Sequence, residues 1–181
     1  MDTKTCLKTR RSVRRFTGEP VSRDLLREAV SLAQYAPSWK NTQTVRYIIV
    51  DDPALKNTIS EKALMGYQRN INNLSTASAA VLVTTVHGLS GYNEDGTPST
   101  AKGSHWESFD AGLAVQTFCL AAHELGLGTV IMGMFDPEKM KEVLELPAGQ
   151  EPSCLLAIGY PTEDSHGNAV RKPLEEVLTF K

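Results

Sequence analysis

The sequence AAVLVTTV at residues 79–86 is an almost unbroken run of small and β-branched apolar residues. Its eight residues have the length of a strand, and a strand without polar alternation is normally covered on both faces. We therefore expect residues 79–86 to form a central strand of a sheet with helices on each side.

The longest expected helix covers residues 106–125, and it is apolar over more than one face. Such a helix belongs against the sheet rather than at the surface. Gly126 follows directly, at the position where glycine commonly ends a helix. Strand and helix together predict an α+β domain.

Shorter patterns predict the other elements. Ser22 and either Asp51 or Asp52 are candidate helix caps, and Pro37 disfavours helical dihedral angles at Ala36. Helices are expected at residues 3–8, 22–36 and 65–73 and from residues 53 and 137 onward, and strands at 45–50, 129–132 and 152–158. Residues 88–104 predict a long surface loop. We find no repeat or linker, so residues 1–181 are expected to form a single domain.

Composition excludes several classes of protein. The chain is 41% apolar and 22% charged, and 19 basic against 21 acidic residues give a net charge of −2. This balance provides no overall basic field for nucleic acid. Cys6, Cys119 and Cys154 are too far apart in sequence to suggest a disulfide framework or a zinc site. Because no apolar stretch resembles a signal peptide or a membrane span, we expect a cytoplasmic protein without a membrane partner.

A basic cluster, TRRSVRRF at residues 9–16, precedes the second expected helix. Four arginines and one serine lie within six consecutive positions. Guanidinium groups donate paired hydrogen bonds to phosphate oxygens, and a serine hydroxyl adds a further donor. The cluster predicts a site for a phosphate-bearing cofactor. The alternative, a solvated basic surface, stays open for these residues taken alone.

No residue pattern indicates catalysis by the protein's own side chains. Gly126 and Gly128 follow a helix and open a strand, the reverse of the order in a dinucleotide-binding fingerprint. The histidines are scattered, without a carboxylate close by in sequence, at positions 87, 105, 123 and 166. We therefore expect no catalytic side chain and no metal, and assign any hard chemistry to a bound cofactor.

Several of these motifs occur together in one known family. RRSVRRF (10–16), APSWKNTQ (36–43), DAG (110–112), LGLGT (125–129), MG (132–133), GYP (159–161) and RKP (171–173) stand in the order and spacing of the nitroreductase family. The chain is thus similar to these FMN enzymes over nearly its whole length. The resemblance implies a three-layer α+β fold with a mixed, mostly antiparallel sheet. It also implies an intertwined homodimer with C-terminal strand exchange and FMN at the subunit interface.

The resemblance also implies roles for individual residues. Arg10 and Ser12 are expected to hold the FMN phosphate, with Arg171 closing on it, and Arg14 to reach the pyrimidine edge. The turn at Met132 is expected to present a backbone N–H to the flavin, although some relatives carry glutamate there. Ser38, Trp39 and Asn41 are expected to come from the partner subunit and cover the cofactor. The full set implied is Arg10, Arg11, Ser12, Arg14, Pro37, Ser38, Trp39, Asn41, Met132, Gly133, Arg171 and Lys172.

The activity implied is ping-pong transfer of hydride from NAD(P)H, through FMN, to nitroaromatic, quinone or other electron-poor acceptors. Within the family, reductive dehalogenation and flavin-fragmenting chemistry are alternatives. Outside it, a non-catalytic flavin-storage protein and a phosphate- or nucleic-acid-binding module remain as alternatives.

Overall fold

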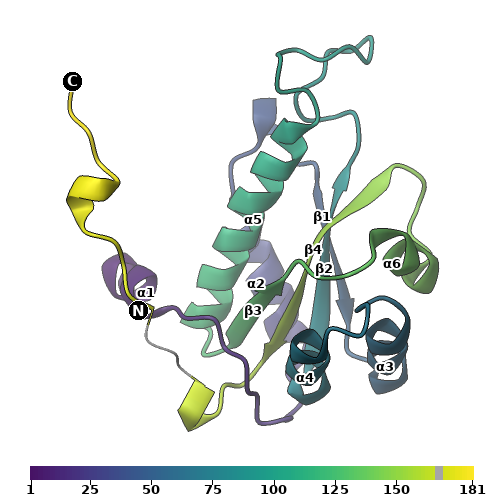
Figure 1. Cartoon of the computed structure of the whole chain (residues 1–181), viewed down its shortest axis with the longest axis vertical. Helices are drawn as coiled ribbons and strands as arrows, with labels where there is room; N and C mark the ends of the chain where they lie inside the picture. Colours follow the sequence, from purple (N-terminus) through teal and green to yellow (C-terminus); the bar gives the residue numbers. More distant parts are fainter. Residues whose placement is uncertain (166–168) are drawn as a thin grey trace.

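The computed structural model describes residues 1–165 and 169–181, so His166 lies outside the described residues. Four antiparallel strands form one sheet in the order β1-β2-β4-β3 (Figure 1). The strands are β1 (Val45–Val50), β2 (Ala79–Val86), β3 (Gly128–Met132) and β4 (Gln150–Gly159). Since β2 lies between β1 and β4, the expectation of a central strand at residues 79–86 is confirmed.

Helices cover both faces of this sheet (Figure 1). One face packs against α2 (Arg23–Ala33) and α5 (His105–Glu124), and the other against α3 (Pro53–Lys62), α4 (Gln68–Thr76) and α6 (Pro137–Leu144). Successive side chains of β2 alternate between the two faces: Val81 joins the α2–α5 core and Leu82 the opposite one. The three-layer α+β architecture is therefore as expected.

Residues 10–17, which we call the arginine strap, run along the free edge of β3. Ser12 forms an isolated parallel bridge with Thr129, and the Val13 N–H donates to the Thr129 carbonyl over 2.9 Å. Further along, the Thr17 N–H donates to the Tyr160 carbonyl over 3.0 Å. This edge contact supplies the parallel component of an otherwise antiparallel sheet.

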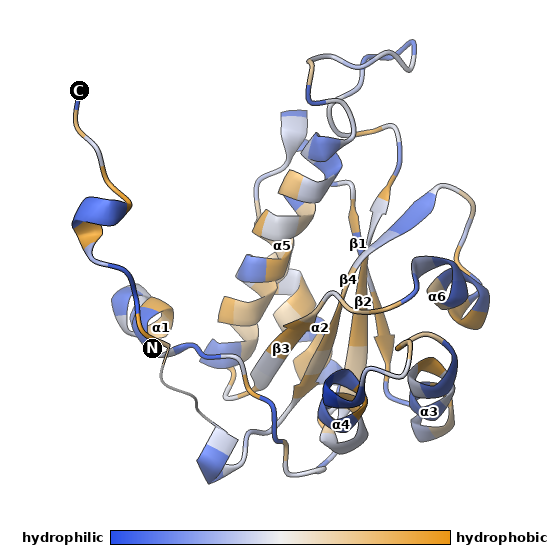
Figure 2. Cartoon of the chain, viewed as in Figure 1, coloured by the Kyte–Doolittle hydropathy of each residue, from blue (hydrophilic) through white to orange (hydrophobic). Residues whose placement is uncertain are grey.

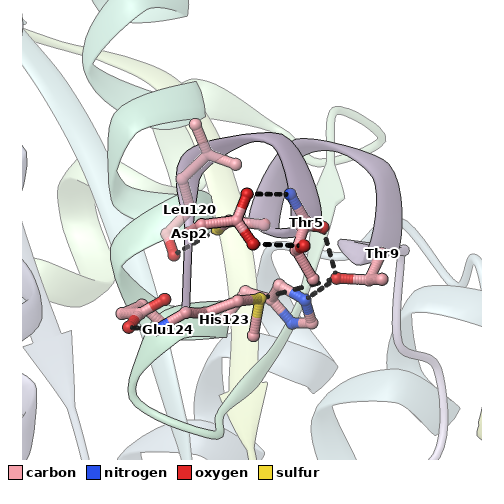
Figure 3. Close-up of polar contacts among 8 residues, drawn as sticks. Asp2, Thr5, Thr9, Leu120, His123 and Glu124 are labelled. Carbon is pink, nitrogen blue, oxygen red and sulfur yellow. Dashed lines mark hydrogen bonds and ion pairs between the residues drawn. The ribbon is translucent and has the colours of Figure 1, made fainter.

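Helix α1 (Thr3–Thr9) attaches the start of the strap to the end of α5 (Figure 3). The Thr9 hydroxyl donates to the Thr5 carbonyl over 2.7 Å and lies 2.8 Å from Nε2 of His123. The N-terminal amino group forms an ion pair with Glu124. These contacts fix where the first arginine of the strap begins.

Helices α2 and α4 differ most from the expectation. α2 ends at Ala33 rather than at residue 36, because its last turn tightens: the Ala36 N–H donates to the Ala33 carbonyl over 3.1 Å. α4 begins at Gln68 rather than at residue 65, because Met65 and Gly66 adopt positive φ angles of 54° and 68° and form a turn. Both helices exist where predicted, but with shifted ends.

Short turns and the C-terminal tail lie outside the layers. Short 3-10 turns occur at η1 (Trp39–Asn41), η2 (Glu163–Ser165) and η3 (Leu174–Glu176). Residues 169–181 extend away from the sheet and are exposed throughout, although Figure 2 shows apolar positions among them. In the part of the chain that the structure describes, no helix has the length and apolarity required to cross a membrane.

Candidate functional site

The arginine strap presents positive charge that no described carboxylate neutralises. Arg10 is half-buried, whereas Arg14 and Arg15 are exposed. No carboxylate of residues 1–165 or 169–181 forms an ion pair with any of these three guanidinium groups. An unpaired arginine cluster next to the Ser12 hydroxyl has the donor chemistry that a phosphate ester requires.

Arg11 plays a different part from its neighbours. Its Nη1 donates to the carbonyls of Lys8 and Arg10, over 2.5 and 2.8 Å, and thereby satisfies the carbonyl end of α1. In this arrangement Arg11 stabilises the start of the strap, whereas the exposed Arg14 donates to the Ser12 carbonyl over 3.3 Å.

Arg10 contributes to the electrostatics of Cys119, a buried thiol of α5. Burial raises the pKa of Cys119, while the hydroxyl of Thr129 and the positive charge of Arg10 partly offset that rise. Along the chain, Arg10 lies between the end of α1, where its N–H donates to the Cys6 carbonyl over 3.0 Å, and the bridge of Ser12 to Thr129 of β3.

The turn after β3 lies further along the same edge. The Met132 side chain is only 2% exposed and packs in the core, with Nδ2 of Asn73 lying 3.9 Å from its sulfur. Asn70 is also buried, and it donates to the Met134 carbonyl over 3.0 Å. Met132 as a whole is thus buried, whereas Gly133, the next residue of the turn, is exposed.

A cavity of about 730 Å³ opens between α5, β3 and the start of β4. Its size is within the range of small-molecule sites in proteins. The half-exposed Ile131 lies on its wall, and sequence reasoning did not select this residue. The alternation of side chains along a strand could have identified it: because Val130 and Met132 face the core, Ile131 must face the other way.

The loop formed by residues 38–43 is strained. Lys40, Asn41 and Gln43 have positive φ angles of 46°, 56° and 48°. For residues with a β-carbon this conformation costs about 1–2 kcal/mol, less for asparagine, so the surroundings must hold it. The Ser38 hydroxyl accepts the Gln43 N–H over 2.9 Å. Strained backbone of this kind is typical of functional loops.

Asp110 of α5 also holds this loop. Its carboxylate is 2% exposed and accepts the Trp39 N–H over 3.0 Å. The Trp39 ring packs on Trp106, with a centroid separation of 4.7 Å, and its indole N–H has no partner among the described residues. The sequence presents Asp110 only as part of the DAG motif, and the signal that could have identified it is a carboxylate next to the apolar stretch of α5.

Helix α5 carries a second buried carboxylate one turn earlier. Glu107 accepts the Gly88 N–H over 2.7 Å and lies 3.2 Å from Nδ1 of His87. The expectation that His87 lacks a carboxylate close in sequence is correct, but the fold supplies one from twenty residues away. The histidine side chain remains 55% exposed.

The C-terminal cations do not meet the strap within the described residues. Arg171 donates to the Ala169 carbonyl over 3.4 Å, and Lys172 pairs with Glu176 over 3.1 Å. Both are exposed.

The residues predicted to bind the cofactor therefore lie in separate groups within one chain. The strap is attached to α5 near His123, whereas the loop 38–43 is held at Asp110. Because a helix rises about 1.5 Å per residue, roughly 20 Å of α5 separates the two attachments. Pro37, Ser38 and Asn41 thus lie with Trp39 at one end of α5, and Arg10 and Ser12 lie at the other.

Fold and site together define a class: an α+β protein with arginines at a sheet edge that no described carboxylate pairs with, and a large cavity between α5, β3 and β4. Within the described residues, no cluster of three or more potential metal ligands occurs.

Comparison with known proteins identifies the family. The model of the nitroreductase family matches residues 7–160. An NADH dehydrogenase of Thermus thermophilus is 31% identical, with 100% of this chain and 97% of the relative covered. An FMN reductase [NAD(P)H] of Bacillus subtilis is 34% identical, covering 92% of this chain and 68% of the relative. The chain belongs to the nitroreductase family.

Comparison with solved structures agrees with this assignment to the family. A nitroreductase in complex with FMN from Desulfovibrio desulfuricans has a TM-score of 0.78 at 28% identity, with 100% of this chain and 98% of that chain covered. An NAD(P)H:FMN oxidoreductase from Staphylococcus epidermidis has a TM-score of 0.85 at 23% identity, covering 99% and 96%. The latter likeness is one of fold.

Proposed function

We propose that this protein is an FMN-dependent oxidoreductase that uses NAD(P)H. The observation that carries the proposal is the arginine strap, whose Arg10, Arg14 and Arg15 form no ion pair with the described carboxylates. The relatives support the same conclusion, since one is named an FMN reductase and another was solved with FMN.

The residues present fit FMN. Arg10 and the Ser12 hydroxyl would hold its phosphate, with Arg171 and Lys172 adding charge from the tail. Arg14 would lie at the pyrimidine edge, where a cation favours the reduced, anionic state. The exposed backbone of Gly133 would donate its N–H to the ring. When bound, FMN supplies hydride transfer in ping-pong order, from NAD(P)H to nitroaromatic, quinone or similar acceptors.

We further propose a homodimer in which the loop 38–43 of one subunit covers the FMN of the other. Two observations support it: α5 keeps this loop far from the strap in one chain, and the tail exposes apolar side chains. Val170 and Phe180 are 92% and 88% exposed, an arrangement that favours burial against a second copy.

The test is the visible absorption spectrum of the purified protein before and after anaerobic addition of NADH or NADPH. We expect a flavin band that bleaches with at least one nucleotide. A band that persists with both would indicate the flavin-storage alternative. Absence of a band after incubation with FMN and desalting would refute the proposal.

The dimer has its own test, sedimentation of the full chain and of a variant ending at residue 168. We expect a dimer for the full chain, and a weaker dimer with reduced FMN affinity for the shortened one. A monomeric full chain with tightly bound FMN would contradict the shared site.

A further inference from the structure

One carboxylate oxygen joins two loops that are far apart in sequence. Oδ2 of Asp110 accepts the Trp39 N–H over 3.0 Å and the Ser90 hydroxyl over 2.7 Å. Both Asp110 and Ser90 are buried, at 2% and 0% exposure. Trp39 belongs to the strained loop 38–43, and Ser90 to the long loop 88–104.

A second set of contacts ties the same loops together. The Trp39 and Trp106 rings pack at 4.7 Å, and Nε1 of Trp106 donates to the Thr100 hydroxyl over 2.8 Å. Both Ser90 and Thr100 of the long loop are therefore attached at the place where Trp39 is held.

We propose that Asp110 is a positioning residue that fixes the loop 38–43 in its left-handed conformation and couples it to the loop 88–104. This inference rests on the proposed function, in which the loop 38–43 covers FMN. The covering loop and the long loop beside it then move as one unit. Asp110 itself does not touch the reacting atoms.

Glu107, one turn earlier on α5, is a buried carboxylate that does not hold Trp39 and therefore serves for comparison. Glu107 is 6% exposed and accepts the Gly88 N–H over 2.7 Å, but forms no hydrogen bond with the loop 38–43 in the described structure. Glu107→Ala is thus a matched control for Asp110→Ala: each removes one buried carboxylate, and only the second releases Trp39.

The readout uses the fact that Trp39 and Trp106 are the two tryptophans of the chain. Their close packing predicts an exciton-coupled circular dichroism band in the flavin-free protein. We expect Asp110→Ala to lose this band, and Asp110→Asn, which keeps an acceptor oxygen, to retain it. Glu107→Ala should also retain it. Retention in Asp110→Ala, or equal loss in Glu107→Ala, would overturn the positioning role.

Ser90→Ala tests the coupling and leaves the carboxylate in place. We expect it to keep the exciton band and yet to be cleaved by trypsin after Lys102 about tenfold faster, because a hydrogen bond to a charged group is lost. An unchanged cleavage rate would refute the link between Asp110 and the loop 88–104. Because Ser90→Ala keeps the carboxylate, it tests this link even if Asp110→Ala does not fold.

Titration with FMN connects these results to function. We expect Asp110→Ala to raise the Kd for FMN about tenfold, because the released loop must be ordered on binding. An unchanged Kd would overturn the role of Asp110 in holding the covering loop. If the wild-type protein does not bind FMN, the proposed function fails, while the exciton band and the cleavage rate still decide how Asp110 acts.

Discussion

Arg10→Ala is expected to weaken FMN binding about 10- to 100-fold, because a hydrogen bond between charged groups contributes about 1.5–3 kcal/mol. Arg10 is half-buried, and no described carboxylate forms an ion pair with its guanidinium. Fluorescence titration of the flavin-free protein with FMN measures the effect.

Arg15→Ala provides the matched control. Arg15 belongs to the same strap and carries the same charge, but its side chain is exposed, and its carbonyl accepts the Thr162 N–H over 3.2 Å whatever the side chain. We expect FMN affinity to change less than threefold, roughly the value of one exposed charge. Equal losses in both variants would show that the strap acts through its general positive field, and the assignment of Arg10 to the phosphate would be wrong.

Gly128→Ala is the second change with a large expected effect. A β-carbon at Gly128 would lie 2.6 Å from Cγ2 and 2.7 Å from Cβ of Val13. Val13 is 3% exposed and hydrogen-bonded to Thr129, so it can yield only by moving the strap away from β3. Overpacking of this kind costs about 1–3 kcal/mol. We expect a melting temperature several degrees lower and weaker FMN binding, since Arg10 and Ser12 move with Val13.

The comparison is Gly112→Ala on α5, where an added β-carbon meets nothing within 4 Å. Because alanine favours a helix over glycine by about 1 kcal/mol, this variant should be at least as stable as the wild type. Thermal unfolding of both flavin-free variants measures the difference. If Gly128→Ala melts at the wild-type temperature and binds FMN normally, β3 does not fix the strap.

Local signals were sufficient for much of the fold. Ser22, Asp52 and Asp136 each cap a helix with their side chains. Gly126 ends α5 with a φ of 79°. The apolar run at residues 79–86 became an inner strand, since only a strand covered on both faces can bury such a sequence. In each case the physical cause lies within a few residues of the feature it produces.

Helix ends were less predictable. α2 stops three residues before its expected end, and α4 begins three residues late. At such boundaries a 3-10 turn or a left-handed residue competes with the helix by small differences in free energy. Tertiary packing decides between them.

The order of the elements, the motifs of the family and the concentration of arginines before the second helix can all be read from the amino-acid sequence. Tertiary structure alone decided how these residues act: that Arg11 turns back onto α1, that the Met132 side chain is buried, and that Asp110 holds two loops with one oxygen. The reason is the range of the interactions. Periodicity and capping act between neighbours in sequence, whereas a buried carboxylate can meet donors from 20 and 71 residues away only after the sheet and α5 have packed.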